Sequence, residues 1–319
     1  MTRVHAVIIG RNEGDRLLAC LDALQGVDGR VIYVDSGSTD GSVEAATERG
    51  AEVVTLDMDQ PFTAARARNA GLDRLADEPD GDLVQTIDGD CALRDDWIAA
   101  ARAFLDTHPA VAVVCGRRRE RLPDGSIYNR LCDAEWNTPV GEARACGGDA
   151  LFRLGPLRDA GFYRADLIAG EEPELCLRLR AAGWKIWRLD AEMTWHDADM
   201  HRFGQWWARS RRAGFAFAEG AALHGAPPER HWVTETRRAI IWGGVLPLAV
   251  LALALVSPAL AVLVALVWPL QIVRIARRPD VGLTRAAFLT LGKFAEAQGV
   301  ADYWFGRLSG RRRGLIEYK

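Results

Sequence analysis

The chain has 319 residues, of which 49% are hydrophobic and 26% are charged, and its formal net charge is −3. This is the composition of a folded protein that can hold one large core, or a domain of about 200 residues plus an appendage. No nucleic-acid partner is expected. Six scattered cysteines without C-x-x-C spacing indicate neither a disulfide framework nor a zinc site.

Charge is divided unevenly along the chain. Residues 205–319 hold 16 basic and 7 acidic residues, whereas residues 1–204 hold 24 and 36. We therefore expect the acidic first part and the basic last part to face different surroundings. The N-terminus runs directly into an apolar strand and lacks the core of a signal peptide, so the first part is expected to stay in the cytoplasm.

Strands and helices alternate over the first 60 residues. Apolar runs at 4–9, 31–34 and 52–56 are typical of parallel strands covered on both faces. The alternation predicts an α/β sheet with right-handed crossovers, in which ligands bind beyond the carboxyl ends of the strands. Polar loops follow the first two ends and carry Arg11, Asn12, Glu13, Asp35 and Ser38. Simple capping turns are the alternative interpretation of each loop.

The next two segments add an arginine and a pair of acids. Residues 61–72 read as a loop entering a helix, from which Arg68 can reach a phosphate or a base. An apolar run then ends in Asp88-Gly89-Asp90, where the glycine lets both acids approach one point. Carboxylates so placed suit Mg²⁺ or Mn²⁺ with positions left open for phosphate oxygens. A solvated turn is the alternative.

The chain resembles the family 2 glycosyltransferases, which have the GT-A fold. Four segments carry the resemblance by their order and spacing: the Asn-Glu after the first strand, VDSGSTDGS, ARARNAGL and IDGD. The resemblance covers residues 3–200 and points to a membrane-associated, bacterial-type member. It implies that these segments hold the nucleotide-sugar and its metal. The donor-binding residues so implied are Arg11, Asn12, Glu13, Asp35, Ser38, Arg68, Asp88 and Gly89, and the acids implied as metal ligands are Asp88 and Asp90.

Two later segments supply the expected acceptor site and base. Gly147 and Gly148 permit close backbone approach, as in a similar family segment beside the acceptor, although a simple turn is the alternative. Residues 170–179 predict a helix with Glu171 and Glu172 at its amino end, where capping alone would also favour them. The family segment G-E-D-x-D-L has its general base at the position of Glu172. Glu171 is the second candidate.

A histidine and an aromatic segment follow. Family members often have a histidine at the position of His196 that reaches the metal or the diphosphate, whereas a lone histidine is more often satisfied inside the fold. Processive members have a Q-x-x-R-W signature, from which the segment QWWAR at 205–209 departs. This departure argues against a polymer-extruding synthase.

The last third of the sequence indicates a membrane region. Residues 239–273 carry no charge, and Ser257-Pro258 divides them into two short helices with arginines at both outer ends. A hairpin returning to the cytoplasmic side satisfies both flanks, and a buried soluble hairpin is the alternative. Residues 286–308 are apolar but interrupted by four charges, which favours an interfacial helix. Three arginines at 311–313 suit anionic headgroups.

The sequence therefore predicts an α/β GT-A domain with a mixed sheet over residues 1–230 and a membrane region over 231–319. The predicted reaction is an inverting, non-processive, hexosyltransferase-like transfer that depends on Mg²⁺ or Mn²⁺. The predicted donor is a UDP-sugar, and the acceptor is a hydroxyl, such as one on a lipid-linked glycan. The expected place is the plasma or inner membrane. A nucleotidyltransferase and a catalytically degenerate membrane scaffold remain alternatives, and whether the apolar run spans or only dips into the bilayer stays open.

Overall fold

The computed structural model describes residues 2–310 of the chain. They form two compact units, which divide between His201 and Arg202. This division lies before the boundary at 230 that the sequence predicted, because the long helix after residue 202 packs within the second unit. The arginine tail at 311–313 lies outside the described residues.

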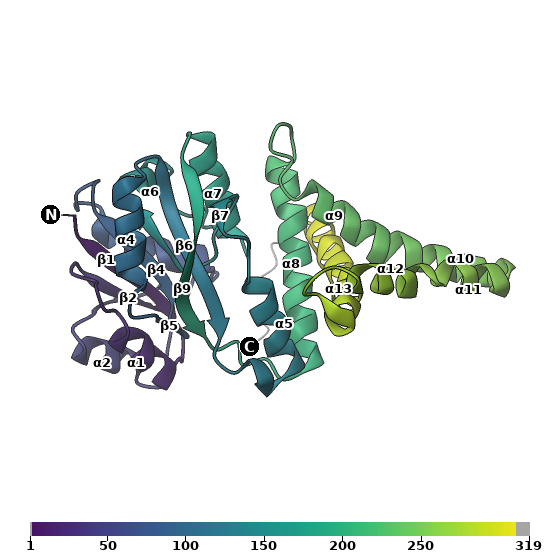
Figure 1. Cartoon of the computed structure of the whole chain (residues 1–319), viewed down its shortest axis with the longest axis horizontal. Helices are drawn as coiled ribbons and strands as arrows, with labels where there is room; N and C mark the ends of the chain where they lie inside the picture. The colour runs from purple at the N-terminus through teal and green to yellow at the C-terminus, as the bar shows by residue number, and fades with distance from the viewer. Residues whose placement is uncertain (1, 311–319) are drawn as a thin grey trace. The chain divides into compact units, whose positions relative to one another are not determined.

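The first unit is built on one mixed, nine-stranded sheet (Figure 1). The strands are β1 (Val4–Gly10), β2 (Val31–Asp35), β3 (Glu52–Thr55), β4 (Leu83–Asp88), β5 (Cys91–Leu93), β6 (Val111–Glu120), β7 (Gly141–Ala143), β8 (Ala150–Arg153) and β9 (Lys185–His196). Their order is β3-β2-β1-β4-β8-β6-β9-β5, and β7 pairs with β9. The strands β1, β2, β3 and β4 pair in parallel, as their apolar runs predicted, and β8 is antiparallel to both neighbours.

Helices cover both faces of this sheet. They are α1 (Asp15–Asp22), α2 (Ser42–Glu48), α3 (Ala64–Leu72), α4 (Trp97–Thr107), α5 (Ile127–Trp136), α6 (Leu154–Asp159) and α7 (Glu171–Ala181), with short 3₁₀ turns at Asp73–Leu75 and Pro123–Gly125. Gly71 of α3 packs on Val7, whereas the Trp97 indole of α4 donates to Gln85. Val7 pairs with Thr86, the neighbour of Gln85, so α3 and α4 lie on opposite faces.

The strand register brings the expected site residues to one edge of the sheet. Asp88 pairs with Ile9 at the carboxyl end of β4, and Thr86 pairs with Ala150 at the start of β8. Because β8 runs in the opposite direction, the residues before Ala150 meet the end of β4. His196 ends β9 and pairs with Cys91 of β5. The polar residues that follow the strands thus converge as parallel-sheet topology requires.

The second unit is helical. Its elements are α8 (Phe203–His224), α9 (Val233–Ile240), a π-helical turn (Ile241–Val245), α10 (Leu246–Val256), α11 (Pro258–Ala265), α12 (Val267–Ala276) and α13 (Gly282–Leu308). The helices α8 and α13 approach closely through glycines: a Cβ on Gly214 would lie 2.0 Å from the Glu296 carbonyl oxygen, and one on Gly299 would lie 1.9 Å from that of Arg211. The predicted interfacial helix at 286–308 is therefore α13, with one face buried against α8.

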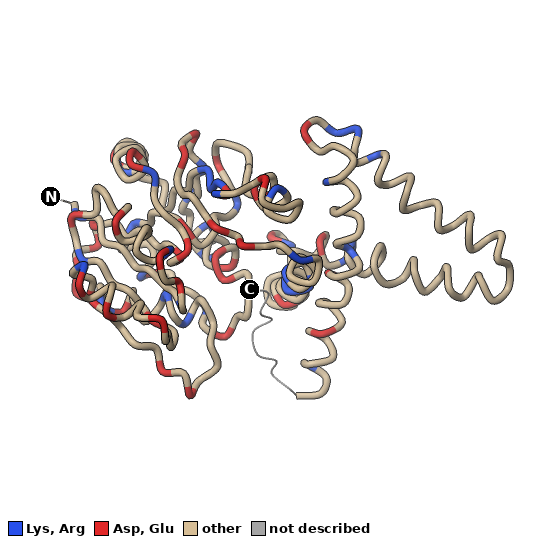
Figure 2. The backbone as a smooth tube through the Cα atoms, turned by 90° about the horizontal axis from the view of Figure 1, so that it is seen from below, with Lys and Arg blue, Asp and Glu red and all other residues tan. Residues whose placement is uncertain are grey.

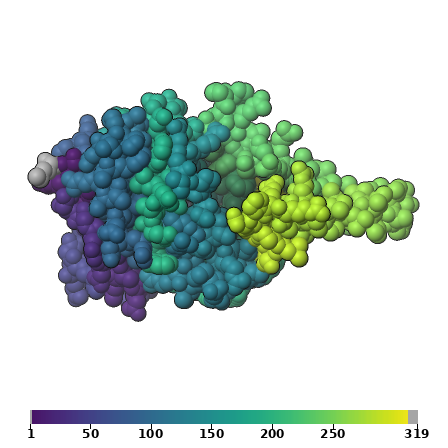
Figure 3. Space-filling view, viewed as in Figure 1, coloured from purple at the N-terminus to yellow at the C-terminus, as the bar shows by residue number. Residues whose placement is uncertain are grey.

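The uncharged run forms two consecutive apolar helical stretches that lie side by side as a hairpin (Figure 1). Val233–Val256 and Pro258–Ala276 are both long and apolar enough to cross a membrane, and only 6% and 11% of their most apolar windows are buried. Ser257 interrupts the helix with an extended backbone, and its hydroxyl accepts from the Leu260 amide. The tube view shows the uncharged arms in tan (Figure 2), and the space-filling view shows the hairpin tip uncovered (Figure 3).

Candidate active site

A buried arginine joins three carboxylates at the carboxyl edge of the sheet. The guanidinium of Arg68 on α3 lies 2.7 Å from Asp88, 2.9 Å from Glu171 and 3.1 Å from Glu172. Arg68 is 2% exposed, and its guanidinium also lies 5.5 Å from the ring centre of Tyr163. The structure therefore brings together an acid from β4 and the two acids at the start of α7, which are more than 80 residues apart in the sequence.

Local sequence explains how these side chains are held. The Thr63 hydroxyl accepts from the Arg66 amide and so caps α3, which fixes the turn from which Arg68 projects. Gly170 has φ +84° just before α7, a conformation that favours glycine. Glu171 and Glu172 then occupy the first turn, where free N–H groups and the helix dipole favour negative charge.

The environment of Glu172 changes its acidity. Burial and the neighbouring Glu171 carboxylate raise the pKa of Glu172 to about 7, although the positive charge of Arg68 opposes this shift. Three acids share one guanidinium, so the site holds a carboxyl group that gains and loses a proton near neutral pH. A carboxylate of this kind is suited to general-base chemistry.

One residue of the glycine pair, Gly148, lies directly against this cluster. A Cβ built on Gly148 would lie 2.4 Å from Arg68 Nη2 and 3.1 Å from both Asp88 Oδ2 and Glu172 Oε1. A Cβ on Gly147 would meet Arg118 Nη2 at 3.4 Å, which is an ordinary contact. The backbone at Gly148 thus approaches the charged groups more closely than any other residue type would allow.

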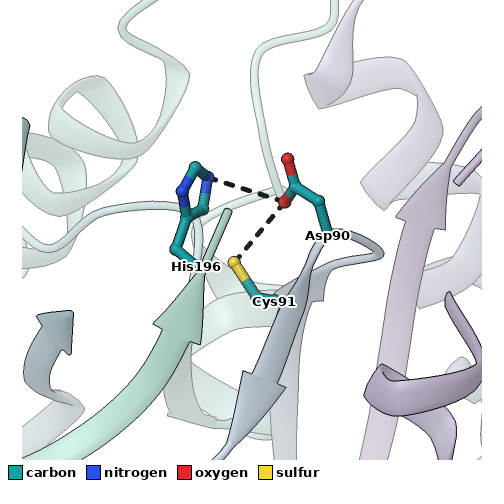
Figure 4. Close-up of side chains that lie close together, drawn as sticks. All are labelled: Asp90, Cys91 and His196. Carbon is teal, nitrogen blue, oxygen red and sulfur yellow. Dashed lines mark hydrogen bonds and ion pairs between the residues drawn. The ribbon is translucent and has the colours of Figure 1, made fainter. Parts of the chain in front are cut away.

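A second group of side chains lies at the tips of β5 and β9. The Asp90 carboxylate is 3.6 Å from His196 Nε2, and Cys91 Sγ is 3.5 Å from the same carboxylate (Figure 4). The carboxylate oxygen, the imidazole nitrogen and the thiol sulfur all lie within 4.8 Å of one another, and all three residues are buried.

The residues present fit a hard divalent cation. Carboxylate oxygen and imidazole nitrogen are both ligands for Mn²⁺, and two protein ligands leave positions for phosphate oxygens. Burial and the nearby Asp149 and Asp90 carboxylates raise the pKa of the Cys91 thiol well above its usual value. Sulfur is also a soft ligand that suits Mg²⁺ or Mn²⁺ poorly, which leaves Asp90 and His196 as the residues that would hold the ion.

The sequence predicted that the carboxylates of Asp88 and Asp90 approach one point, and the structure does not place them so. The Asp88 carboxylate turns to Arg68, whereas Asp90 turns to His196. Gly89 lies between them and its amide donates to the Ile9 carbonyl. Among the described residues, Asp88 is not part of the cluster that could ligate a metal. Its predicted metal role therefore rests on the resemblance and not on this geometry.

The loops after β1 and β2 interlock. Asp35 is 2% exposed and accepts from the amides of Gly37 and Ser38. The Ser38 hydroxyl accepts from the Asn12 amide, and Asn12 accepts from the amide of Thr39. The Glu13 side chain covers Gly10 and Gly89, and Arg11 is exposed. Hydrogen bonds thus join the two loops that carry the predicted nucleoside-binding residues. The Asp35 carboxylate also stabilises the turn that follows it.

Sequence reasoning missed three residues that connect the two groups. Asp149 follows the glycine pair, is fully buried, and pairs with Arg118 at 3.0 Å. The Arg118 guanidinium lies 5.5 Å from the ring centre of Trp136. Strand alternation was the available signal, because it places Arg118 on the opposite face from Arg117 and Arg119.

Comparison with known proteins agrees with this fold. Residues 6–152 match the family described as Glycosyl transferase family 2. The mannosyltransferase PcManGT of Pyrobaculum calidifontis, solved with GDP-Man and Mn²⁺, superposes with a TM-score of 0.67 at 20% identity, over 96% of this chain and 88% of its own. This likeness shows a shared fold.

Two curated bacterial proteins are similar in sequence. The succinoglycan biosynthesis protein ExoA of Rhizobium meliloti is 24% identical over 198 residues, which is 56% of this chain. The pre-mycofactocin glycosyltransferase of Mycobacterium tuberculosis is 27% identical over 237 residues, which is 69% of this chain. The chain spans 58% and 48% of the length of these relatives. With the mixed sheet and its acid-tipped strands, these matches show that residues 6–152 are similar to glycosyl transferase family 2 and that the chain has the GT-A fold.

Proposed function

We propose that this chain transfers a sugar from a nucleotide-sugar to a hydroxyl acceptor, with inversion at the anomeric carbon. The observation that carries the proposal is the contact of Arg68 with Asp88 on one side and with Glu172 on the other. The Arg68 guanidinium thereby contacts both Asp88, which is expected at the donor, and Glu172, which is expected at the acceptor. The match of residues 6–152 to glycosyl transferase family 2 supports a nucleotide-sugar as the donor.

Each residue has a defined task in this proposal. Glu172 accepts the proton of the acceptor hydroxyl as the new bond forms, and a single base opposite the leaving group implies inversion. Arg68 holds Glu172 and Asp88 in place and keeps positive charge beside the donor. Asp90 and His196 hold a divalent cation, which when bound supplies positive charge to the departing diphosphate.

Separate parts of the site are proposed to bind the donor and the acceptor. The interlocked loops with Asn12, Asp35 and Ser38 are proposed to receive the nucleoside, and a UDP-sugar remains the predicted donor. The glycine pair is proposed to border the acceptor, and a lipid-linked glycan would suit a chain with an apolar hairpin.

Donor binding tests the proposal directly. A nucleotide-sugar at about 100 times its Kd should stabilise the protein by about 2.7 kcal/mol and raise its melting temperature. We expect this shift with Mn²⁺ present and its loss in EDTA, and UDP- and GDP-sugars compared side by side identify the base. The free sugar serves as the control. Equal shifts for free sugar and nucleotide-sugar, or a shift unaffected by EDTA, would contradict the proposal.

The Gly148→Ala substitution should reduce sugar transfer strongly. Its methyl group would displace the Arg68 guanidinium, and misplacing such a group by about 1 Å costs about 100-fold in rate. Gly147→Ala is the matched comparison, because its methyl group would meet Arg118 at an ordinary distance and would leave Arg68 in place, so turnover should fall much less than in Gly148→Ala. Steady-state rates of the two variants, with melting temperatures to exclude misfolding, check this. Equal rates for both would remove Gly148 from the site.

We also propose that the hairpin spans a bilayer and anchors the enzyme. At 1.5 Å per residue the two stretches of 24 and 19 residues are about 36 and 28 Å long, close to the roughly 30 Å hydrocarbon thickness. The interrupted backbone at Ser257 would be costly inside hydrocarbon, so we place it at the far surface. Arginines flank both outer ends, which favours the cytoplasmic side for them.

Labelling of a cysteine at the hairpin tip tests this topology. All six native cysteines are buried, so they should react slowly. In sealed vesicles, Ser257→Cys should react with an impermeant thiol reagent added on the side opposite the catalytic unit. Leu122→Cys, on an exposed site of the first unit, should react from the other side. Labelling of Ser257→Cys only after detergent would show that the hairpin dips without crossing.

A further inference from the structure

Asp149 lies at the point where four strands of the first unit meet. It precedes β8, which lies between β4 and β6 in the sheet, and β9 follows β6. Its Oδ1 accepts from the Asp88 amide at 3.1 Å. Its Oδ2 accepts from the Thr194 hydroxyl and faces Arg118 Nη2, both at 3.0 Å. The fully buried Asp149 carboxylate therefore contacts β4, β6 and β9 at the sheet edge that carries the candidate active site.

Arg118 extends this connection to the proposed metal ligands. Its guanidinium lies over the Trp136 ring, 5.5 Å from the ring centre. The Trp136 ring in turn meets the His196 imidazole edge-on, with centroids 4.6 Å apart and planes at 69°. Such aromatic pairs have a preferred geometry, so the indole limits how the imidazole can rotate. The contacts run without interruption from Asp149 through Arg118 and Trp136 to His196.

The two ends of this chain of contacts serve different halves of the proposed site. At one end Asp149 holds the main chain of Asp88, whose carboxylate contacts Arg68. At the other end Trp136 contacts His196, which lies 3.6 Å from Asp90. Hydrogen-bonded partners that fix the ring of a ligand-binding histidine typically contribute 10- to 100-fold in metal affinity, and the Trp136 ring would fix the His196 imidazole by packing instead.

We propose that Asp149, Arg118 and Trp136 are positioning residues that set the His196 imidazole relative to the Asp88–Gly89–Asp90 turn. This inference rests on the proposed function and deepens it. A buried ion pair adds little to stability compared with an apolar pair of the same shape. Its placement between the two halves of the site gives it a specific use.

Asp149→Asn and Trp136→Leu test the proposal. Asparagine keeps an acceptor for the Asp88 amide but loses the charge that holds Arg118, and leucine removes the ring against His196. We expect Mn²⁺ affinity, measured by calorimetry without donor, to fall at least about 10-fold in both variants. Trp136→Phe, which keeps an aromatic ring, should recover most of this loss.

Asp82→Asn is the matched control. Asp82 is also a buried carboxylate of the first unit and accepts from the Arg3 amide, but it lies at the opposite end of β4 from Asp88. Asp82 lies with His5 and Glu78 in a separate cluster that could hold a metal ion. Its loss should therefore lower the melting temperature without changing Mn²⁺ affinity at the Asp90–His196 site, which is the binding step that Asp90→Ala abolishes. If Asp149→Asn and Trp136→Leu behave as Asp82→Asn does, with unchanged Mn²⁺ affinity, the three residues are merely structural and the inference fails.

A second measurement separates this inference from the proposed function. The imidazole nitrogen shifts of His196, read by NMR without metal or donor, should change in Asp149→Asn and Trp136→Leu and stay constant in Asp82→Asn. Moved shifts in a protein that binds no Mn²⁺ would overturn the proposed function and retain the positioning role. Unmoved shifts would overturn the positioning role whatever the protein catalyses.

Discussion

Replacing Glu172 with glutamine is expected to reduce kcat for sugar transfer by about 1000-fold, within the range that a general base contributes. Glutamine keeps the size of the side chain and can still accept from Arg68 at the 3.1 Å contact, but it cannot take a proton. Donor binding should therefore persist, so that KM for the nucleotide-sugar changes little. Steady-state kinetics with donor and acceptor varied separately would measure both quantities.

Glu171→Gln is the matched comparison, because it removes the neighbouring carboxylate from the same arginine. We expect a smaller loss of kcat for this variant. If Glu171→Gln were the more damaging change, the base would be Glu171 and the proposed assignment would be reversed. Equal, small effects of both changes would favour a catalytically degenerate scaffold.

The pH dependence of the wild-type protein should report the same group. Burial and Glu171 raise the pKa of Glu172 to about 7, so below that pH the base is protonated. We expect kcat/KM to rise tenfold per pH unit up to about pH 7 and then to level off. Glu171→Gln should move this limb to lower pH, because it removes a charge that raises the pKa of Glu172. A profile flat from pH 5 to 8 would contradict the assignment.

The free energy of unfolding should fall as pH rises, whereas kcat/KM rises. The pKa of Glu172 is raised on folding, so its contribution to stability is present at low pH and is lost as pH rises through about 7. Glu172→Gln removes this loss and should be as stable as the wild type, or more stable, at pH 8. Loss of activity without loss of stability would separate catalysis from folding.

The Asp90→Ala substitution should lower kcat/KM by at least about 100-fold, comparable to the loss of one group that stabilises developing charge. Asp90 offers the carboxylate of the pair 3.6 Å from His196, and removing it leaves one ligand for a hard cation. The residual activity should no longer respond to Mn²⁺ or EDTA. Direct titration of Mn²⁺ checks the same loss without an activity assay.

Asp88→Asn distinguishes the two acids of the turn. The Asp88 carboxylate contacts Arg68, so its neutralisation should weaken donor binding while Mn²⁺ affinity stays near that of the wild type. If Asp88→Asn and Asp90→Ala lost Mn²⁺ affinity equally, the two carboxylates would share one ion. The Asp88 and Asp90 carboxylates, which lie apart in the structure, would then move together when the ion binds.

Much of the site was accessible from the sequence because its residues follow strands. Asp35 and Asp88 end apolar runs, and parallel topology brings the ends of such runs to one edge whatever lies between them. The hairpin was equally readable, because charge is absent from 239 to 273 and Ser257-Pro258 interrupts that run. The predicted helix over 170–179 placed Glu171 and Glu172 at its amino end, and the resemblance implied that one of them is the base.

Other features depend on side-chain directions that no local pattern fixes. The glycine between them suggested that Asp88 and Asp90 approach one point, but the Asp88 carboxylate contacts Arg68 and the Asp90 carboxylate lies near His196. The boundary between the units moved for a similar reason, since glycines on α8 and α13 allow a backbone contact between segments about 80 residues apart. Neither contact has a signature within one segment.

By itself, the order of residues determined the kind of sheet, the edge at which ligands would gather, and the apolar hairpin, because these follow from periodicity, turn chemistry and the length of uncharged runs. Tertiary structure alone decided that Arg68 holds both proposed halves of the site and that Asp149, Arg118 and Trp136 connect Asp88 to His196. Such long-range contacts depend on the register of strands paired out of sequence order, as β8 is between β4 and β6.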